Sequence, residues 1–285
     1  MVEIEKAAEI GFCFGVRRAI DTLERIARER GSVETLGAVV HNRQVLQRLA
    51  GIGVRVADSI DDIRGNVVAI GAHGASPRTM EELRARQIRT VNTTCPFVLR
   101  AQKVAHRLAR QGFVVVIYGD ANHPEVEGIL GWAGNNGVAM LDAARVAALG
   151  PPPRRLGVLA QTTQIPAHFT EFNRELIGIV LGKDSDVRIV DTICHDIRRR
   201  QAAAMEMAGR VDLMLVVGDR TSANTNRLVE LCAAATTTQL IETADEIQAE
   251  SIRGHRRIGV TGGASTAEQT INEVLAKLEA AGGPS

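Results

Sequence analysis

The sequence predicts an α/β protein made of three similar small domains with mostly parallel sheets. Short apolar runs such as Phe113–Tyr118 and Leu213–Val217 alternate with amphipathic helical stretches along the chain, which is typical of βαβ units. A spacing also recurs, because three cysteines are each followed by a polar residue 28 positions later, in the pairs Cys13–His41, Cys95–His123 and Cys194–Ser222. Such a recurrence indicates one structural unit used three times.

The individual elements support this fold class. In the first predicted helix, Val16, Ile20, Leu23 and Ala27 recur at helical spacing and form one apolar stripe. The predicted strands are short apolar runs, most of them followed at once by glycine and polar residues: Asn66–Ile70, Phe113–Tyr118, Leu156–Ala160, Val187–Val190, Leu213–Val217 and Ile258–Val260. The repeat predicts domain boundaries at 1–94, 95–193 and 194–285, with the C-terminal tail joining the first domain.

A second polar residue follows later in each third, namely His73, Thr162 and Ser265. The cysteines and both sets of polar residues lie just after an apolar run or in the turn that follows it. Open parallel sheets bind ligands beyond the carboxyl ends of their strands. We therefore expect each repeat to contribute one thiolate and two polar side chains to a shared site, although strand-to-helix loops are polar in any case.

Composition excludes several classes of function. A formal net charge of +1 gives no reason to expect nucleic acid or an anionic membrane surface. Aromatic residues make up only 3% of the chain, so stacking platforms for bases are scarce. The N-terminus lacks a signal-peptide pattern, and no apolar run is long enough to span a bilayer. Four cysteines in such a chain predict reduced thiols and a cytoplasmic protein.

Three of the cysteines are candidate metal ligands. Cys13, Cys95 and Cys194 do not belong to CxxC pairs, which excludes a zinc ribbon, and three thiolates meeting at one point favour a metal cluster over a disulfide. Pro96 predicts a helix that starts next to Cys95 and favours its thiolate. Each of the three is also consistent with a buried structural cysteine. Cys232 lies within an apolar helical stretch and is predicted to be core.

The polar residues indicate an anion site. His41, His73 and His123, if protonated and close together, would hold a diphosphate, although each is also consistent with a structural histidine. Ser222, with Asn224 close behind it, is predicted to open a helix, where unpaired N–H groups bind phosphate.

Two further features leave alternatives open. Ser265 and Glu268 match a capping box, which alone would explain both residues. Glu125 is either a first-turn acid that complements the helix dipole or a proton donor. Thr162 and Thr163 are either helix caps or partners of a substrate hydroxyl.

Nine ordered motifs resemble the LytB family, the 4-hydroxy-3-methylbut-2-enyl diphosphate reductases. They are GFCFGV, VVHN, GAHG, TTCP, NHPEVEG, QTTQ, DTIC, SANTNRL and GGAST, which run from about residue 10 to about 278. The resemblance implies a trefoil of three α/β domains in pseudo-threefold arrangement around one central [4Fe-4S] cluster. It implies that Cys13, Cys95 and Cys194 hold this cluster, whose fourth iron takes the substrate hydroxyl.

The resemblance also implies the roles of the other residues. Diphosphate binding maps onto His41, His73, His123, Ser222, Asn224 and Ser265. Glu125 maps onto the proton source, with Thr162 as its partner near the hydroxyl and His123 beside them. The implied reaction is the last step of the non-mevalonate isoprenoid pathway, in which the hydroxyl leaves as water and isopentenyl and dimethylallyl diphosphates form. No GxGxxG fingerprint is present, so an external electron donor such as a ferredoxin or flavodoxin is implied.

Some positions depart from the family pattern. Ala223 stands where a second serine is common, which removes one hydroxyl from the diphosphate site. The other departures are Asn92–Thr93, His195–Arg198 and Gly262–Gly263. None of them removes a residue with a catalytic role in the family.

Three other functions are weighed against the reductase. An iron–sulfur electron carrier or redox sensor would normally have four protein ligands. An iron–sulfur hydro-lyase would need no electron donor. A phosphometabolite-binding module without a cluster would be colourless.

Overall fold

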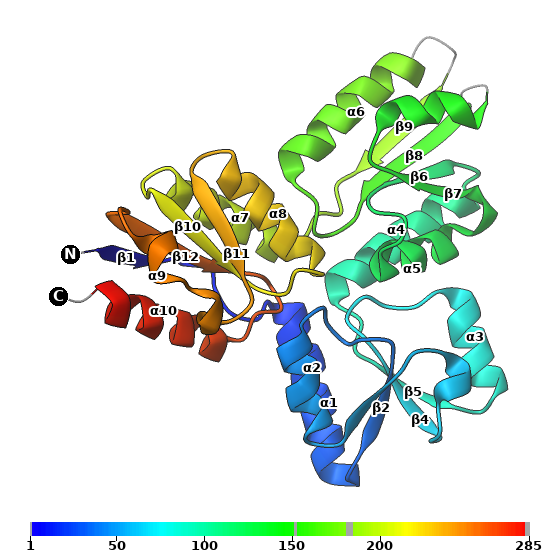
Figure 1. Ribbon diagram of the computed structural model, residues 1–285. Coiled ribbons are helices and arrows are strands. Elements are labelled where there is room, and N and C mark those ends of the chain that lie inside the picture. Colours follow the sequence, from blue (N-terminus) through cyan, green and yellow to red (C-terminus); the bar gives the residue numbers. More distant parts are fainter. Residues whose placement is uncertain (1, 151–152, 181–184, 283–285) are drawn as a thin grey trace. The chain divides into compact units, whose positions relative to one another are not determined.

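The computed structural model describes residues 2–150, 153–180 and 185–282, and it contains three four-stranded parallel sheets (Figure 1). The chain forms two compact units. The first unit comprises Met1–Arg17, Val40–Gly51 and His195–Ser285, and the second comprises Arg18–Val39 and Ile52–Cys194. The predicted fold class of three α/β domains with parallel sheets is confirmed.

The second unit holds two of the sheets. One has the strand order β3-β2-β4-β5 and the other the order β7-β6-β8-β9. Their strands are β2 (Val33–Leu36), β3 (Val54–Ala57), β4 (Val67–Ile70), β5 (Arg89–Asn92), β6 (Val114–Tyr118), β7 (Gly137–Met140), β8 (Arg155–Ala160) and β9 (Asp186–Val190). The helices between them are α3 (Pro77–Ala85), α4 (Pro96–Arg110), α5 (Pro124–Ala133) and α6 (Pro166–Val180), with 3₁₀ turns η1 (Ile60–Asp62), η2 (Gly134–Asn136) and η3 (Ala143–Leu149).

The first unit holds the third sheet, with the strand order β1-β12-β10-β11. Its strands are β1 (Glu3–Lys6), β10 (Leu213–Val217), β11 (Thr237–Ile241) and β12 (Arg257–Gly262). Its helices are α2 (Arg43–Ala50), α7 (His195–Ala208), α8 (Ala223–Ala233), α9 (Ala249–Ile252) and α10 (Glu268–Gly282), with the 3₁₀ turn η4 (Ala244–Glu246). Helix α1 (Phe14–Arg30) begins in this unit and continues into the second.

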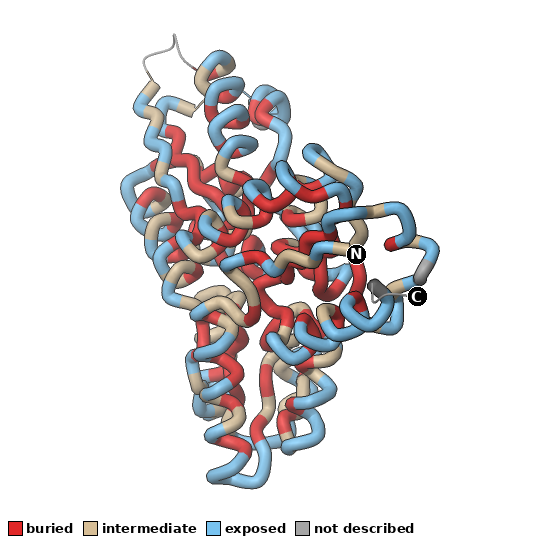
Figure 2. Tube along the Cα trace, turned by 90° about the vertical axis from the view of Figure 1, so that its left-hand side faces the viewer, coloured by how far each residue is buried: buried red, intermediate tan, exposed pale blue. Residues whose placement is uncertain are grey.

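The interior strand β10 is buried on both faces. In β10, Leu213 and Leu215 pack in one core cluster with α10, whereas Met214 and Val216 pack in another with α7 and α8. Strand side chains alternate between faces, so helices on both faces require a continuous apolar run. Nearly every residue of β6, β8, β10 and β12 is buried, and Figure 2 colours the buried residues red.

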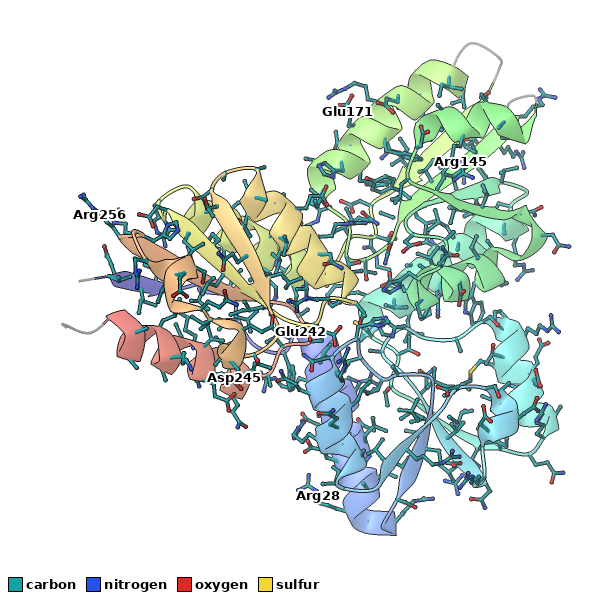
Figure 3. The ribbon with its side chains drawn as sticks, viewed as in Figure 1. Arg28, Arg145, Glu171, Glu242, Asp245 and Arg256 are labelled. Atoms are coloured by element: carbon teal, nitrogen blue, oxygen red, sulfur yellow. The ribbon has the colours of Figure 1, made fainter. Side chains whose placement is uncertain are left out.

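Charged residues lie on the outer faces of the elements. Arg28, Glu171 and Arg256 are exposed and extend away from the ribbon in Figure 3. Among the described residues, no helix combines the length and apolar character that crossing a bilayer requires.

The first strand differs from the expected domain membership. Residues 1–94 were predicted as one domain, but β1 pairs in parallel with β12 of the last sheet. Val2 and Ile4 pack with Ile271 and Val274 of that sheet's core, and this apolar contact explains the pairing. The C-terminal helix α10 therefore lies with β1 on the last sheet. The other predicted boundaries stay predictions.

The core packing predicts that two leucines of one domain contribute very differently to the free energy of unfolding. Leu176 on α6 is fully buried among Phe169, Phe172 and Val180, whereas Leu141 is 47% exposed. Leu176→Ala should lower the free energy of unfolding by about 2–5 kcal/mol, because it leaves a cavity. The matched Leu141→Ala should change it by less than about 0.5 kcal/mol. Urea denaturation followed by circular dichroism measures both, and equal effects would contradict this account of the core.

Candidate functional site

The predicted site residues follow nine different strands. In each sheet one edge strand leads to a cysteine: β1 leads to Cys13, β5 to Cys95 and β9 to Cys194. The two interior strands lead to the polar residues, which are His41 and His73 after β2 and β4, His123 and Thr162 after β6 and β8, and Ser222 and Ser265 after β10 and β12. Each cysteine thus follows an edge strand of its sheet.

The 28-residue spacing is one helix followed by one strand. The segments from Cys13, Cys95 and Cys194 to the next polar residue contain α1 and β2, α4 and β6, and α7 and β10. The second spacing varies because the segments between the two interior strands differ, with η3 in the second repeat and η4 with α9 in the third. The recurrence therefore has the structural origin that the sequence predicts.

In the second unit, Cys95 lies against the loop that carries His73. The N–H of Cys95 donates to the carbonyl of Ala72 at 3.0 Å. Cys95 is the N-cap of α4, and Pro96 occupies the first turn, as predicted. A Cβ on Gly74, where φ is +78°, would lie 2.5 Å from the amide nitrogen of Gln102. Glycine at this position is therefore required for the His73 loop to lie against α4.

His123 lies beside His73, and its ring is fixed by a backbone contact. The two ring centroids are 5.4 Å apart at an angle of 82°. His123 is buried, and its Nδ1 accepts the N–H of Glu125 at 3.1 Å. An accepting Nδ1 carries no proton, so the neutral ring has its proton on Nε2. In this tautomer the Nε2–H of His123 is available as a hydrogen-bond donor.

Glu125 is a buried carboxyl group held at both oxygens by Thr162. Its side chain is 2% exposed, and its Oε1 and Oε2 accept the N–H and Oγ1 of Thr162 at 2.7 and 2.8 Å. Burial raises the pKa of Glu125, against these two hydrogen bonds, which lower it. Glu127, two residues further on α5, is exposed. Glu125 lies in the first turn of α5, so the dipole-complementing and the proton-donor interpretations both stay open.

Thr162 also connects Glu125 to Cys194. The N–H of Cys194 donates to the carbonyl of Thr162 at 2.9 Å, and Cys194 is buried. Thr162, in the segment after β8, therefore bonds to the Glu125 carboxyl group through its N–H and hydroxyl, and to the backbone of Cys194 through its carbonyl. Thr163 Oγ1 is buried and has no hydrogen-bond partner within the described part of the chain.

In the first unit, Cys13 is surrounded by hydrogen-bond donors and a cation. Its N–H donates to the carbonyl of Ala264 at 3.0 Å. Burial raises the pKa of the Cys13 thiol, against the N–H groups of Val16 and Gly15 and the Arg200 guanidinium, which lower it. Arg200 is buried on α7, and sequence reasoning missed this residue.

Arg200 fixes the loop before Cys13. Its guanidinium donates to the carbonyls of Glu9, Gly11 and Gly262 at 3.1, 2.8 and 2.9 Å. These bonds join the segment that follows β1 to the end of β12. The loop of Cys13 is thus held at the edge of its own sheet.

Ser265 and His41 are in contact, but the predicted capping box is wrong. Helix α10 begins at Glu268, so Ser265 is not its N-cap. The Ser265 hydroxyl instead donates to the carbonyl of His41 at 2.9 Å. The pKa of His41 lies below its usual value because burial lowers it more than the charge of Asp219 raises it.

Ser222 and Asn224 open α8. Ser222 is the N-cap, and its hydroxyl accepts the N–H of Thr225 at 3.4 Å. Asn224 is 4% exposed, and neither atom of its amide has a hydrogen-bond partner among the described residues. A buried amide without partners costs free energy. The Asn224 amide is therefore available to a polar ligand at the start of α8.

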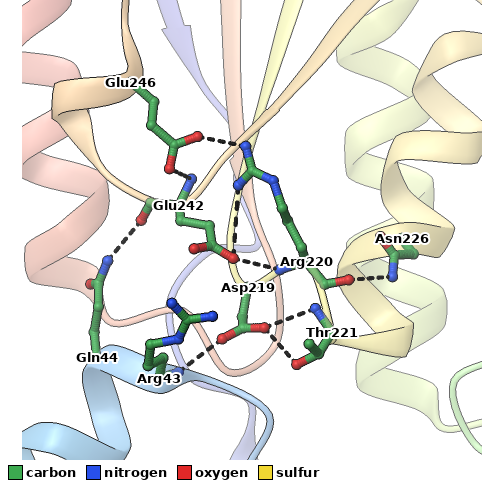
Figure 4. Close-up of polar contacts among 8 residues, drawn as sticks. All are labelled: Arg43, Gln44, Asp219, Arg220, Thr221, Asn226, Glu242 and Glu246. Atoms are coloured by element: carbon green, nitrogen blue, oxygen red, sulfur yellow. Dashed lines mark hydrogen bonds and ion pairs between the residues drawn. The ribbon is translucent and has the colours of Figure 1, made fainter.

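Asp219 organises the loop that carries these residues, and sequence reasoning missed it. Its carboxylate accepts the N–H of Arg43 at 2.9 Å and both the N–H and Oγ1 of Thr221 at 2.8 and 2.6 Å (Figure 4). Burial tends to raise the pKa of Asp219, but these bonds and the charge of Arg43 hold it below its usual value. The available signal was an aspartate two residues before a threonine, which favours an Asx turn.

Flanking ion pairs complete this network. Arg220 donates to Glu246 at 2.6 Å, its N–H donates to Glu242 at 2.9 Å, and its carbonyl accepts from Asn226 at 2.9 Å (Figure 4). Gln44 donates to the Glu242 carbonyl at 2.8 Å. The start of α2, which follows His41, and the loop before α8 are therefore joined within one unit.

Comparisons with known proteins give a consistent result over nearly the whole chain. The family model described as LytB protein matches residues 4–279. A curated relative from Dehalococcoides mccartyi (strain CBDB1), named 4-hydroxy-3-methylbut-2-enyl diphosphate reductase, is 57% identical over 98% of each chain. A relative of the same name from Geobacter sulfurreducens is 40% identical over 98% of this chain and 97% of its own.

Two solved structures are similar as well. A structure titled (E)-4-hydroxy-3-methyl-but-2-enyl diphosphate reductase, the terminal enzyme of the non-mevalonate pathway, is 34% identical with a TM-score of 0.71, and the match covers 98% of this chain and 100% of that one. The Plasmodium falciparum E-1-hydroxy-2-methyl-but-2-enyl-4-diphosphate reductase has a TM-score of 0.92 at 24% identity, covering 98% of this chain and 88% of that one. The latter likeness supports the fold.

The Asp219 network predicts a change in the titration of His41. Asp219→Asn removes a negative charge that favours the protonated imidazole, so the pKa of His41 should fall further below its usual value. The control Asp245→Asn, an exposed aspartate of η4, should leave it unchanged. A pH titration of the His41 ring by NMR measures both variants. An unchanged His41 pKa in Asp219→Asn would show that Asp219 does not act on this ring.

Proposed function

The chain belongs to the LytB family and is an enzyme, and on this premise we propose that it reduces (E)-4-hydroxy-3-methylbut-2-enyl diphosphate. The proposed products are isopentenyl and dimethylallyl diphosphates, formed in the last step of the non-mevalonate pathway. The observation that carries the proposal is the buried Glu125 carboxyl, held at both oxygens by Thr162 next to Cys194. The relatives' names favour a reductase over a hydro-lyase.

We propose that Cys13, Cys95 and Cys194 hold one [4Fe-4S] cluster per chain. The surroundings of these thiols fit such a group: Cys13 has two N–H donors and Arg200 nearby, and Cys95 lies at the start of α4, where no side chain caps the helix. The donors and the cation offset part of the burial that raises the pKa of Cys13, and a helix N-terminus favours a thiolate at Cys95. Cys232 does not fit, because it lies in an apolar core cluster where no donor or cation offsets the burial that raises its pKa to about 11. When bound, the cluster supplies electrons and an iron without a protein ligand.

The diphosphate is proposed to bind the residues that the family resemblance implies. The unpartnered Asn224 amide, the start of α8 behind Ser222 and the Nε2–H of His123 offer donors to phosphate oxygens. His41, His73 and Ser265 complete the set. Because His123 donates while neutral, binding at this residue does not require its protonation.

Glu125 is proposed to supply a proton to the leaving hydroxyl. Burial raises its pKa and thus favours the protonated form that an acid catalyst needs. Thr162 holds both carboxyl oxygens in place, so the acid has one fixed orientation. The reaction consumes two electrons and two protons, breaks the C–O bond and releases water. An external donor such as a ferredoxin or flavodoxin supplies the electrons.

We further propose that the enzyme works in the cytoplasm. All four cysteines are thiols rather than disulfides, which matches a reducing compartment.

The cysteine assignment predicts the iron content of four variants. Cys13→Ser, Cys95→Ser and Cys194→Ser should each lose nearly all bound iron after anaerobic purification, because each removes one of three thiolate ligands. Cys232→Ser should retain normal iron, since Cys232 lies within a core cluster. Iron and sulfide counts per chain measure the effect. Normal iron in Cys194→Ser would refute the three-ligand assignment.

The role of Glu125 predicts a contrast between two substitutions on α5. Glu125→Gln keeps the size of the side chain but removes the acidic proton, so turnover should fall by about 10²–10⁴-fold. The control Glu127→Gln changes an exposed residue and should lower turnover less than about threefold. Both variants should keep normal iron. Full activity of Glu125→Gln would assign the proton source elsewhere.

A further inference from the structure

Positive charge is concentrated on one helix of the second unit. The chain as a whole is nearly neutral, with 34 basic and 33 acidic residues. Helix α4 nevertheless contains Arg100, Lys103, Arg107 and Arg110 and no aspartate or glutamate. The first three recur at positions i, i+3 and i+7, so they lie on one face of the helix.

These three cations border a groove with an apolar floor. The groove has a volume of about 490 Å³, and its lining includes Leu99 and Val104 of α4 and Val190 of β9. Arg100, Lys103 and Arg107 are exposed, and none has a carboxylate partner in the described part of the chain. Unpaired surface cations around an apolar patch are suited to an acidic protein partner.

The groove lies next to a proposed cluster ligand. Pro96 lines the groove and directly follows Cys95, the N-cap of α4. A partner seated there would be close to the Cys95 sulfur. Electron-transfer partners bind through small, transient interfaces, in which complementary charge speeds the encounter. A groove of this size with a basic rim fits that kind of contact better than a permanent interface.

We propose that this basic groove is the docking surface for the electron donor, a small acidic redox protein. The proposal rests on the proposed function, because it assigns the surface through which that reaction receives its two electrons. Arg100, Lys103 and Arg107 steer the acidic donor toward Cys95, and the apolar floor gives short-range contact. These three residues take no part in substrate binding.

The test compares two triple variants of the full-length, cluster-loaded protein. The first variant replaces the three groove cations with glutamine, which is a good helix former: Arg100→Gln/Lys103→Gln/Arg107→Gln. The control Arg78→Gln/Arg84→Gln/Arg89→Gln removes three exposed arginines from α3 and β5 of the same unit. Each is assayed with a reduced acidic [2Fe–2S] ferredoxin as donor and, separately, with dithionite and methyl viologen. Ferredoxin binding is also titrated by fluorescence anisotropy at low and high salt, without turnover.

The groove variant should lose about tenfold or more in kcat/KM for ferredoxin, with weaker and less salt-dependent binding, because steering contributes about 10–10³-fold to association. Its turnover with dithionite and methyl viologen, and both activities of the control, should stay within about twofold. Unchanged ferredoxin binding, an equal loss with both reductants, or equally tight binding of duplex DNA would overturn the proposal. Absence of wild-type turnover with the chemical reductant, with ferredoxin binding intact, would instead contradict the proposed function.

Discussion

Every strand of the three sheets runs parallel to its neighbours, and this constraint determines where the candidate site residues lie. The loops after parallel strands all emerge at the carboxyl ends of the strands. In each sheet three adjacent strands are followed by one cysteine and two polar residues at these ends, while the strands β3, β7 and β11 are followed by none of them. The repeated spacing in the sequence follows from this arrangement.

Within each unit, backbone contacts join the candidate residues one to another. In the second unit, Cys95 bonds to the loop of His73, His73 lies against His123, and Thr162 links Glu125 to Cys194. In the first unit, Cys13 bonds to the residue before Ser265, and Ser265 bonds to His41. Burial of a carboxyl group is costly unless hydrogen bonds offset it, so the double contact to Thr162 explains how Glu125 is kept inside the protein.

The interior strands other than β2 were predictable from the sequence, whereas β2 and most edge strands were not. Strands β4, β6, β8, β10 and β12 are covered by helices on both faces and therefore read as apolar runs. Edge strands such as β5, with the sequence RTVN, are largely exposed and carry no such signal. The pairing of β1 with β12 joins the two ends of the sequence, and no local pattern indicates that contact.

The positions of the site residues at the ends of strands were predictable, but the residues that hold the site loops in place were not. Asp219 contacts Arg43, and Arg200 contacts Gly11. In both cases the partner lies far away in the sequence. Ser265 matched a local capping pattern, yet the contact with His41 uses its hydroxyl instead. Local patterns predict turns and caps, whereas long-range hydrogen bonds depend on the tertiary fold.

The central claim is that this chain reduces an allylic diphosphate with electrons from outside. It is tested most directly by a stoichiometry measurement on the anaerobically purified protein, with 4-hydroxy-3-methylbut-2-enyl diphosphate as substrate and a titrated reductant. The account predicts that two electrons are consumed for each molecule of isopentenyl or dimethylallyl diphosphate formed, with no conversion in the absence of reductant. Conversion without reductant, or oxidation of the reductant without loss of the substrate hydroxyl, would contradict it.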